Sequence, residues 1–370
     1  MNFDFSEDQK LFKAQVARFL ADKCPLTVAR RVLDGEESHA SEVWKGLADL
    51  GALGVAIPEA HGGLGLGMLE LCVIAEEVGR ACAPVPFTSS ICLAGEAIRR
   101  FGSEAQKQAW LPRIANGEAI GTLAVSEGPH GTPAAKVAAT LTGDKLTGVK
   151  VPVADGEAAH VAIVLAQGGT GPTLALVDLA QDGVARKRVQ TVDPTCKHAE
   201  LSFDGAKAEA LGGRGEGLAL LKGLHDVAAV LIAFEQIGGA EAALMMARDF
   251  ALERYAFGRP IASYQAIKHK LADAYIKIEL ARSNAFYGAM MLASDGADLA
   301  LAAATSRVAA TEAYEYSAKE NIQTHGGIGF TWEANTQFHY RRSRYLALTI
   351  GGQTHWRNKL VSELEKRNAA

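Results

Sequence analysis

The spacing of apolar residues changes twice along the chain, and this restricts the fold more than any other feature of the sequence. Up to about residue 116, apolar residues recur at three- and four-residue intervals, as in "SEDQKLFKAQVARFL", which is the period of an amphipathic helix. From there to about residue 210, β-branched runs such as "HVAIVLAQ" and "PTLALVDL" are separated by Gly, Asp and Pro, the pattern of strands and turns. The helical period then returns in long segments at 216–252, 263–294, 297–323 and 335–367.

This order predicts an α+β protein. We expect an N-terminal helical domain at 1–116, a central antiparallel, β-barrel-like domain at 117–210 and a C-terminal four-helix bundle at 211–370. A chain of 370 residues is longer than one hydrophobic core usually supports, which favours several domains.

Composition narrows the class of function. The formal net charge is −4, so no electrostatic reason exists to expect nucleic acid or an anionic membrane as a partner. The five cysteines show no CxxC spacing, which predicts free thiols in a reducing cytoplasm and no metal site. The N-terminus has no signal-peptide core and no uninterrupted apolar run is long enough to span a membrane, so we expect a cytoplasmic protein.

Two segments carry the chemistry. In "ERYAFGRPIASYQ", Arg254 offers a planar fork of donors suited to a pyrophosphate, and Phe257 offers an aromatic face. In "ENIQTHGGIGF", Gln323 can bond ribose or phosphate oxygens, and Gly326 and Gly327 let backbone approach a ligand closely. Alone, Arg254 could equally pair with Glu253 and the glycines could simply end a helix; the two motifs together predict a dinucleotide site.

With "IPEAHGGLG" and "LAVSE", these motifs resemble the acyl-CoA dehydrogenase family over essentially the whole chain. The resemblance implies the fold given above, an FAD cofactor, an acyl-CoA substrate and electron-transfer flavoprotein as acceptor. It implies that the second chain of an oligomer contacts the adenine half of the FAD. The cofactor-binding residues it implies are Arg254, Ala256, Phe257, Tyr264, Gln265, Gln323, Thr324, Gly326 and Gly327, with Val125 and Ser126 of the β domain at the flavin ring.

The usual catalytic carboxylate is missing from both of its family positions. Members of the family remove an α-proton with a glutamate while the β-hydrogen leaves as hydride to the flavin. Counting from Phe330 places Ile350 at one glutamate position, inside a stretch without acids between Glu333 and Glu363; counting back from Phe257 places Ala228 at the other. Asp226 and Glu235 are the weak candidates that remain. Asp226 faces another side of the helix, and Glu235 lies about 10 Å further along its axis.

The β domain also departs from the family pattern. "LAVSEGPHGTPAAKV" lacks the Gly-Ser-Asp that often follows this strand, and Pro152 and Ala154 replace a common aromatic and a common hydroxyl. By contrast, the two motifs around Arg254 and Gly326, which hold the adenine half of FAD in the family, keep the family pattern.

This asymmetry favours the base-lacking subunit of a bacterial heteromeric acyl-CoA dehydrogenase, an α2β2 assembly with a homologous subunit. Such heteromers are associated with bulky acyl-CoAs, including steroid side chains, and the resemblance alone implies this substrate class. The alternatives are a self-sufficient homotetrameric dehydrogenase that uses Asp226 or Glu235, a non-catalytic binding protein of the same fold and a flavin-dependent oxygenase. The basic run Arg341–Arg344 is the only support for nucleic-acid binding, and such runs are usually solvated helix faces.

Overall fold

A computed structural model describes residues 5–35, 37–128 and 137–369 of the chain. Its elements follow the predicted order of helices, strands and helices, and the α+β fold class is confirmed. The helical elements before the sheet are α1 (Glu7–Lys23), α2 (Leu26–Asp34), α3 (Ser41–Asp49), η1 (Glu59–His61), α4 (Met68–Arg80), the π-helix η2 (Thr88–Gly95), α5 (Glu96–Phe101) and α6 (Glu104–Ala115). Helix α1 begins with a reciprocal capping box between Ser6 and Gln9.

The strands and the second set of helices follow. The strands of the sheet are β1 (Gly121–Ala124), β2 (Thr140–Thr142), β3 (Lys145–Ala154), β4 (Val161–Gly168), β5 (Gly171–Asp178), β6 (Val184–Val189), β7 (His198–Lys207) and β8 (Glu209–Leu211). The later elements are α7 (Gly217–Glu253), β9 (Tyr255–Ala256), β10 (Arg259–Pro260), η3 (Ile261–Ser263), α8 (Gln265–Ala293), α9 (Leu299–His325), η4 (Gly326–Phe330), α10 (Thr336–Leu348) and α11 (Gln353–Ala369).

Two compact units emerge from the contacts between residues. We call Met1–Ala29, Cys72–Ala83 and Ala229–Ala370 the helical unit, and Arg30–Leu71 and Pro84–Ala228 the sheet unit. Helices α4 and α7 therefore contribute residues to both. The three domain ranges expected from the sequence stay a prediction.

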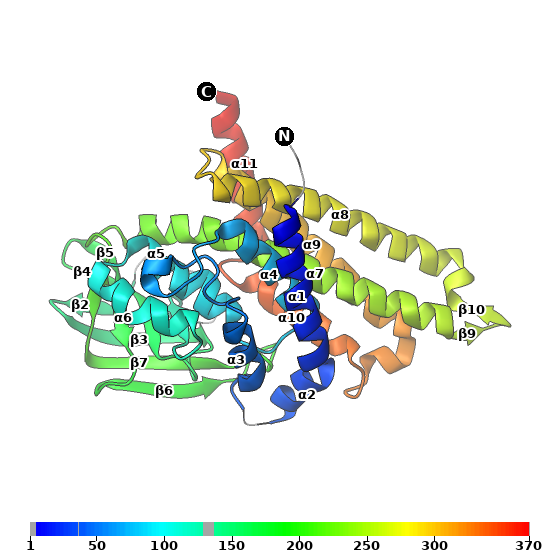
Figure 1. Cartoon of the computed structure of the whole chain (residues 1–370), viewed down its shortest axis with the longest axis horizontal. Helices are drawn as coiled ribbons and strands as arrows, with labels where there is room; N and C mark the ends of the chain where they lie inside the picture. Colours follow the sequence, from blue (N-terminus) through cyan, green and yellow to red (C-terminus); the bar gives the residue numbers. More distant parts are fainter. Residues whose placement is uncertain (1–4, 36, 129–136, 370) are drawn as a thin grey trace. The chain divides into compact units, whose positions relative to one another are not determined.

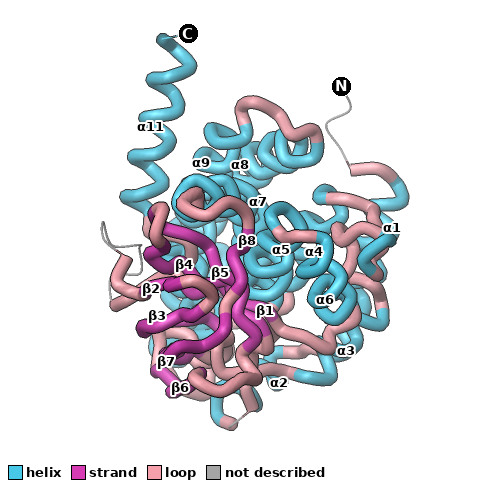
Figure 2. Tube along the Cα trace, turned by 90° about the vertical axis from the view of Figure 1, so that its left-hand side faces the viewer, coloured by secondary structure: helices cyan, strands magenta, loops and turns pink. Residues whose placement is uncertain are grey.

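The sheet unit contains a mixed sheet, drawn in magenta in Figure 2, with the strand order β6-β7-β3-β2-β4-β5-β8. Most neighbours are antiparallel, as expected, but β1 pairs in parallel with β4, with Gly121 opposite Val161. The β2–β3 hairpin lies between these strands in sequence and provides the long connection that a parallel pair requires. Helix η2 packs on β1, where the Ser90 hydroxyl accepts a hydrogen bond from the Gly121 amide over 2.9 Å.

In the helical unit, α9 contacts α8, α10 and α11. The sequence predicted one helix over 335–367, whereas the structure has α10 and α11 with a turn at residues 349–352 between them. Ile350 and Gly351 have φ of 58° and 108°, so the helical path cannot continue through them. Ile350 and Gly351 thus form a helix break that the apolar period alone did not reveal.

Helices α4 and α7 approach each other backbone to backbone inside the helical unit. A Cβ atom added at Gly79 would lie 1.8 Å from the Glu235 carbonyl oxygen, and one at Gly238 would lie 1.8 Å from the Glu76 carbonyl oxygen. Only glycine fits at either position, and the pair fixes how the two helices cross.

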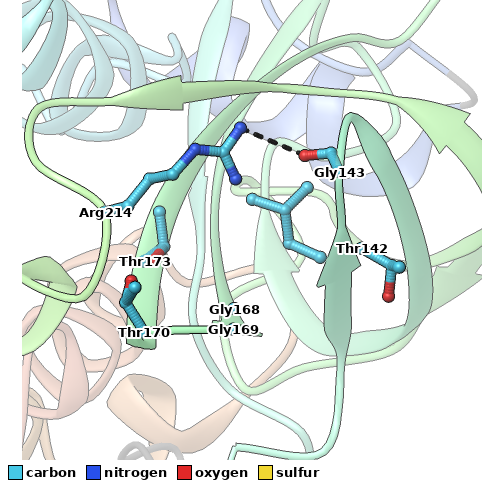
Figure 3. Close-up of a pocket in the computed structure, with 8 residues that line it drawn as sticks. Thr142, Gly143, Gly168, Gly169, Thr170, Thr173 and Arg214 are labelled. Carbon is cyan, nitrogen blue, oxygen red and sulfur yellow. Dashed lines mark hydrogen bonds between the residues drawn. The ribbon is translucent and has the colours of Figure 1, made fainter.

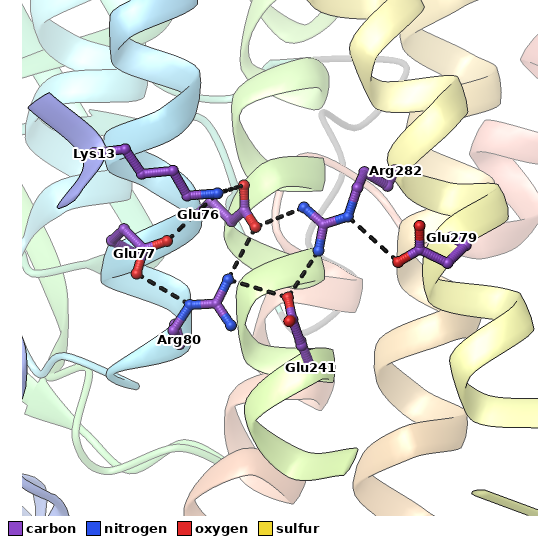
Figure 4. Close-up of polar contacts among 7 residues, drawn as sticks. All are labelled: Lys13, Glu76, Glu77, Arg80, Glu241, Glu279 and Arg282. Carbon is purple, nitrogen blue, oxygen red and sulfur yellow. Dashed lines mark hydrogen bonds and ion pairs between the residues drawn. The ribbon is translucent and has the colours of Figure 1, made fainter. Parts of the chain in front are cut away.

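A cluster of charges joins four helices of the helical unit (Figure 4). Glu76 on α4 is 1% exposed; it accepts from Lys13 of α1 over 2.7 Å and from Arg282 of α8 over 2.6 Å. Arg80 bonds Glu76 and Glu241 of α7, each over 3.0 Å. Burial alone would raise the pKa of Glu76, but Lys13 and Arg282 lower it overall.

Helix α7 is long and apolar enough to cross a membrane by length and composition, and its most apolar window has a mean hydropathy of 1.7. Of that window, 67% is buried inside the protein, which is the behaviour of a core helix. The burial of α7, rather than its composition, indicates a core helix and not a membrane-spanning one.

Candidate cofactor-contacting surface

The first motif forms a tight hairpin at the end of α7. Strands β9 and β10 pair with Arg259 opposite Ala256, and the two turn residues, Phe257 and Gly258, have φ of 51° and 80°. Two positive φ values are those of a type I′ turn, where Asn or Gly is usual and an aromatic residue is uncommon. The Phe257 side chain is 97% exposed. The hairpin therefore holds the Phe257 ring in solvent although the positive φ of this residue is unfavourable for an aromatic side chain. Such a ring is suited to contact a molecule outside this chain.

Arg254 directly precedes the hairpin and is exposed. Its main chain is fixed, because its amide donates to the Phe250 carbonyl over 2.9 Å and its carbonyl accepts from Ile261 over 2.8 Å. Among the described residues its guanidinium has no hydrogen-bond or ion-pair partner, so the alternative pairing with Glu253 is not formed. Because its backbone is fixed and its planar guanidinium has free donors, Arg254 is suited to bind the oxygens of a phosphate from outside this chain.

Tyr264 and Gln265, also expected at the cofactor, lie where η3 meets α8. The Tyr264 hydroxyl donates to the Ala256 carbonyl over 2.9 Å, and the Arg259 guanidinium lies 4.0 Å from the centre of the Tyr264 ring. The Tyr264 hydroxyl therefore stabilises the hairpin through its hydrogen bond to Ala256. Gln265 is exposed at the first position of α8.

The second motif ends α9. Gly326 has φ 62° and ψ −140°, a conformation open essentially to glycine alone, and it starts the short helix η4. Added Cβ atoms at Gly326 and Gly327 would meet no atom within 4 Å, so both glycines border open space. Gln323 is exposed, whereas Thr324 is only 7% exposed and contributes to the core.

The two motifs lie at the same end of the helical unit. The rings of Phe250 on α7 and His325 on α9 stack with centroids 4.1 Å apart, and one turn earlier the Asn321 amide lies 3.3 Å from the Met246 sulfur. Helices α7 and α9 therefore run side by side in the same direction, with both motifs following their C-terminal ends. Figure 1 shows β9 and β10 beyond the end of α7. The structure thus brings together the residues that the sequence separates.

Val125 and Ser126, expected at the flavin ring, belong to the sheet unit, where a buried ion pair fixes them. The Lys150 side chain has no exposed surface; its Nζ donates to the Val125 carbonyl over 3.2 Å and to Glu127 Oε1 over 2.6 Å. Glu127 also accepts from the amides of Ala138 and Ala139, over 2.7 and 2.9 Å. Burial lowers the pKa of Lys150, and Glu127 partly offsets this effect. Residues 129–136, where the Gly-Ser-Asp of the family is missing, lie outside the described residues.

Lys150 and Glu127 were not predicted from the sequence. A signal was present, because two-residue alternation from the buried Leu146 places residue 150 on the inner side of β3. A lysine at an inward position requires a buried carboxylate nearby.

Neither expected base position holds a carboxylate in the structure. Ala228 is fully buried on α7, and Ile350 is half-buried in the α10–α11 turn. Glu235 is 2% exposed and lies 3.6 Å from the Arg342 guanidinium, which also donates to the Ala83 carbonyl over 3.1 Å. Glu235 is therefore half of a buried ion pair. Asp226, on the part of α7 that belongs to the sheet unit, is 7% exposed.

Arg307 on α9 supports the turn that carries Ile350. Its guanidinium donates to the Thr349 carbonyl over 3.0 Å, to the Leu346 carbonyl and, over 2.6 Å, to Gln236. Burial lowers the pKa of Arg307 to about 9. These bonds satisfy carbonyls that the end of α10 leaves without helical partners. The sequence alone does not indicate this role, because Arg307 is distant from the turn along the chain.

Comparison with known proteins decides the family. Residues 6–118 match the N-terminal domain model of acyl-CoA dehydrogenases, and residues 215–361 match the C-terminal domain model. The chain belongs to the acyl-CoA dehydrogenase family. It is 30% identical to the acyl-CoA dehydrogenase FadE27 of Mycobacterium tuberculosis, over 90% of this chain and 91% of that protein.

Two solved structures are similar to this chain over almost the full length. A variant of the Tcur3481–Tcur3483 steroid acyl-CoA dehydrogenase has a TM-score of 0.89 at 32% identity, covering 98% of this chain and 99% of that one. A chain of the ChsE4–ChsE5 complex from Mycobacterium tuberculosis has a TM-score of 0.89 at 29% identity, covering 99% of each. The expected fold and family are thereby confirmed.

Members of the acyl-CoA dehydrogenase family depend on FAD, and the residues at the end of the helical unit fit the nucleotide part of that cofactor. Arg254 has uncommitted donors for a phosphate, Phe257 offers a ring face, and the space over Gly326 and Gly327 is open. Among the described residues, no group of three or more His, Cys, Asp and Glu side chains is placed to hold a metal ion.

Proposed function

We propose that this chain is the base-lacking subunit of a heteromeric acyl-CoA dehydrogenase and that it supports FAD at the interface with a homologous subunit. The observation that carries the proposal is an asymmetry. The nucleotide-contacting residues are present and uncommitted, while alanine and isoleucine occupy the two base positions at Ala228 and Ile350.

The exposure of the first motif supports a site completed by a second subunit. The Phe257 and Arg254 side chains are exposed, and the Arg254 guanidinium has no hydrogen-bond or ion-pair partner among the described residues. Ile328, Phe330 and Trp332, which follow the glycine motif, are also at least half exposed. An apolar surface of this kind next to uncommitted charged donors is typical of a surface that another chain covers.

The reaction divides between the two chains. When bound, FAD would supply the hydride acceptor for desaturation of an acyl-CoA thioester. The partner supplies the carboxylate that takes the proton. Arg254 and Gln323 of this chain would hold phosphate and ribose oxygens of the nucleotide, and Phe257 would offer it a ring face.

The buried ion pair of Glu235 argues against a self-sufficient enzyme. The Glu235 carboxylate lies 3.6 Å from the Arg342 guanidinium in the interior of the helical unit, a position that suits a structural ion pair. Asp226 remains the residue through which the alternative, a homotetrameric dehydrogenase, would act. A non-catalytic binding protein has no specific support from the structure.

Two relatives support the substrate and assembly classes. One is described as a steroid acyl-CoA dehydrogenase with two named components and another as a complex of two chains. By this analogy we propose a bulky acyl-CoA, such as a steroid side-chain thioester, as substrate and an α2β2 heteromer as assembly. Electron-transfer flavoprotein as acceptor and a cytoplasmic location belong to the same proposal.

Flavin content tests this function. The chain is purified alone and after co-expression with a homologous chain encoded by a neighbouring gene, and FAD per chain is measured by absorbance. We expect a flavin-containing complex that reduces a dye with acyl-CoA, and an inactive chain alone. A chain that is yellow and active by itself would refute the proposal, and Asp226→Ala and Glu235→Ala variants would then identify its base.

A further inference from the structure

Helix α8 carries a row of exposed apolar side chains on its outer face. Its inner side packs on α9, with Ala274, Ile278 and Ala281 buried. Positions 276, 280, 283 and 287 recur every three or four residues and therefore share the opposite face of the helix. We call the residues of this face and their neighbour at position 275 the α8 stripe: Tyr275, Ile276, Leu280, Ser283 and Tyr287. The four large side chains are each at least 42% exposed.

The α8 stripe is separate from the sites described above. Tyr275 lies about 15 Å along the helix axis from Gln265, where α8 begins beside the hairpin motif. Figure 1 shows α8 as an outer helix of the helical unit. The pocket of ≈ 280 Å³ in Figure 3, where Arg214 donates to the Gly143 carbonyl over 3.1 Å, belongs to the sheet unit and is lined by none of the stripe residues. An apolar helix face of this kind suits a protein partner and not a small ligand.

The charged side chains beside the stripe are committed to contacts within the chain. Lys277 pairs with Glu312 of α9 over 2.6 Å. Arg282 pairs with Glu279 over 3.6 Å and with the charge cluster of Figure 4. An apolar contact over these turns of α8 would therefore leave no charge buried without a partner.

The two ends of α8 carry opposite charges. Lys268 is exposed in the first turn of the helix, and Asp295 is exposed directly after its last turn. Neither side chain forms an ion pair among the described residues. Each charge has the same sign as the helix dipole at its own end, which is unfavourable for a single helix. A second helix that runs antiparallel to α8 would bring the opposite dipole end and the opposite charge to both places.

We propose that the α8 stripe binds α8 of a second copy of this chain in antiparallel orientation. A two-fold axis at the middle of the stripe, between positions 280 and 283, sets Ile276 against Tyr287 of the second copy. At each end of the contact it sets Lys268 against Asp295. Such a surface is self-complementary, as a contact between identical chains requires. In the α2β2 heteromer, on whose proposed function this role rests, the nucleotide motifs contact the homologous subunit and the α8 stripe joins the two copies of this chain.

Analytical ultracentrifugation of the full-length chain, alone and co-expressed with the homologous subunit, tests this contact. Leu280→Glu brings two carboxylates together at the centre of the paired stripes. Leu218→Glu is the matched control, because Leu218 on α7 is a leucine of similar exposure outside the stripe. We expect Leu280→Glu to raise the dissociation constant at least about tenfold, so that the chain alone becomes monomeric and the heterotetramer becomes an αβ heterodimer, while Leu218→Glu keeps the wild-type masses.

Exchange of the end charges tests the orientation and the identity of the partner. Lys268→Glu and Asp295→Lys should each weaken the association, whereas the double variant should restore it, because each copy then offers the exchanged pair to the other. If both single variants weaken the association and the double variant does not restore it, α8 contacts the homologous subunit and the proposal is wrong. Wild-type masses in Leu280→Glu would also overturn it. If Leu280→Glu does not fold, the charge exchange decides.

The same measurements separate this inference from the proposed function. A chain that is yellow and active by itself would refute the base-lacking role. If Leu280→Glu halves the mass of that homo-oligomer, the α8 contact stands; if the mass is unchanged, the α8 contact is refuted as well.

Discussion

The Glu235 carboxylate lies 3.6 Å from the Arg342 guanidinium in the interior of the helical unit, where neither side chain is more than 3% exposed. This pairing assigns Glu235 to structure. Removing one partner of a buried pair leaves an uncompensated charge, so Glu235→Ala should lower the free energy of unfolding by about 3–5 kcal/mol. Chemical denaturation measures this loss.

The double variant Glu235→Ala/Arg342→Met is the control for that prediction. It removes Arg342 together with Glu235, so it should recover part of the stability lost in Glu235→Ala; the buried Arg307, whose pKa Glu235 raises, keeps its charge in both variants. If Glu235→Ala left stability unchanged but abolished turnover, Glu235 would be the catalytic base and our assignment would be wrong.

Because α4 and α7 are in close contact at two glycines, the fold should not tolerate a methyl group added at either glycine. Gly79→Ala and Gly238→Ala each place a Cβ atom 1.8 Å from a carbonyl oxygen of the other helix, so both variants should fold poorly or lose several kcal/mol, roughly as other overpacked cores do. Gly223→Ala on α7 is the matched control, because no atom lies within 4 Å of its added Cβ. It should be neutral or stabilising by about 1 kcal/mol. Thermal unfolding of the three variants distinguishes them, and equal behaviour would contradict the close approach.

The buried His339 predicts a loss of stability in mild acid. Burial and then the neighbouring Arg342 lower the pKa of His339 to about 4. The unfolded chain binds a proton at this histidine near its ordinary pKa of about 6.5 while the folded chain does not, so stability falls as pH drops from about 6.5 to about 4. The full effect of this one group is about 3 kcal/mol.

Replacement of His339 tests that dependence. His339→Gln should flatten the curve of unfolding free energy against pH in this interval, while His269→Gln, at an exposed position on α8, should leave it unchanged. An unaltered slope in His339→Gln would show that other groups cause the acid sensitivity.

The exposed nucleotide motif predicts variants that lose cofactor but not stability. In the complex with the homologous subunit, Arg254→Gln should weaken FAD retention roughly tenfold or more, because a charge-assisted bond to phosphate is lost, and Phe257→Ala should act in the same direction. Arg248→Gln is the control, since Arg248 is committed to Asp249 over 2.6 Å on the same helix. FAD retention is measured by gel filtration and flavin absorbance. Wild-type retention in Arg254→Gln would exclude this residue from the cofactor site.

Much of the fold was predictable because local patterns specify it. The capping box at Ser6 and the glycine after His325 mark helix ends in the sequence, and the β-branched runs mark the strands. The motifs around Arg254 and Gly326 were found for the same reason, since each is continuous along the chain.

The remaining features depend on contacts between distant residues. Nothing near Arg307 indicates that it binds carbonyls at the end of α10, and nothing near Lys150 names Glu127 as its partner. The break at Ile350 was missed because its apolar side chain continues the helical period while its φ of 58° does not. Parallel pairing of β1 with β4 likewise follows from topology and not from either strand's sequence.

Anaerobic titration of the purified chain with an acyl-CoA, after loading with FAD, tests most directly whether this polypeptide lacks a base. We predict that the flavin absorbance persists with the chain alone and bleaches only when the homologous subunit is added. Bleaching of the flavin by acyl-CoA in the chain alone would contradict the account.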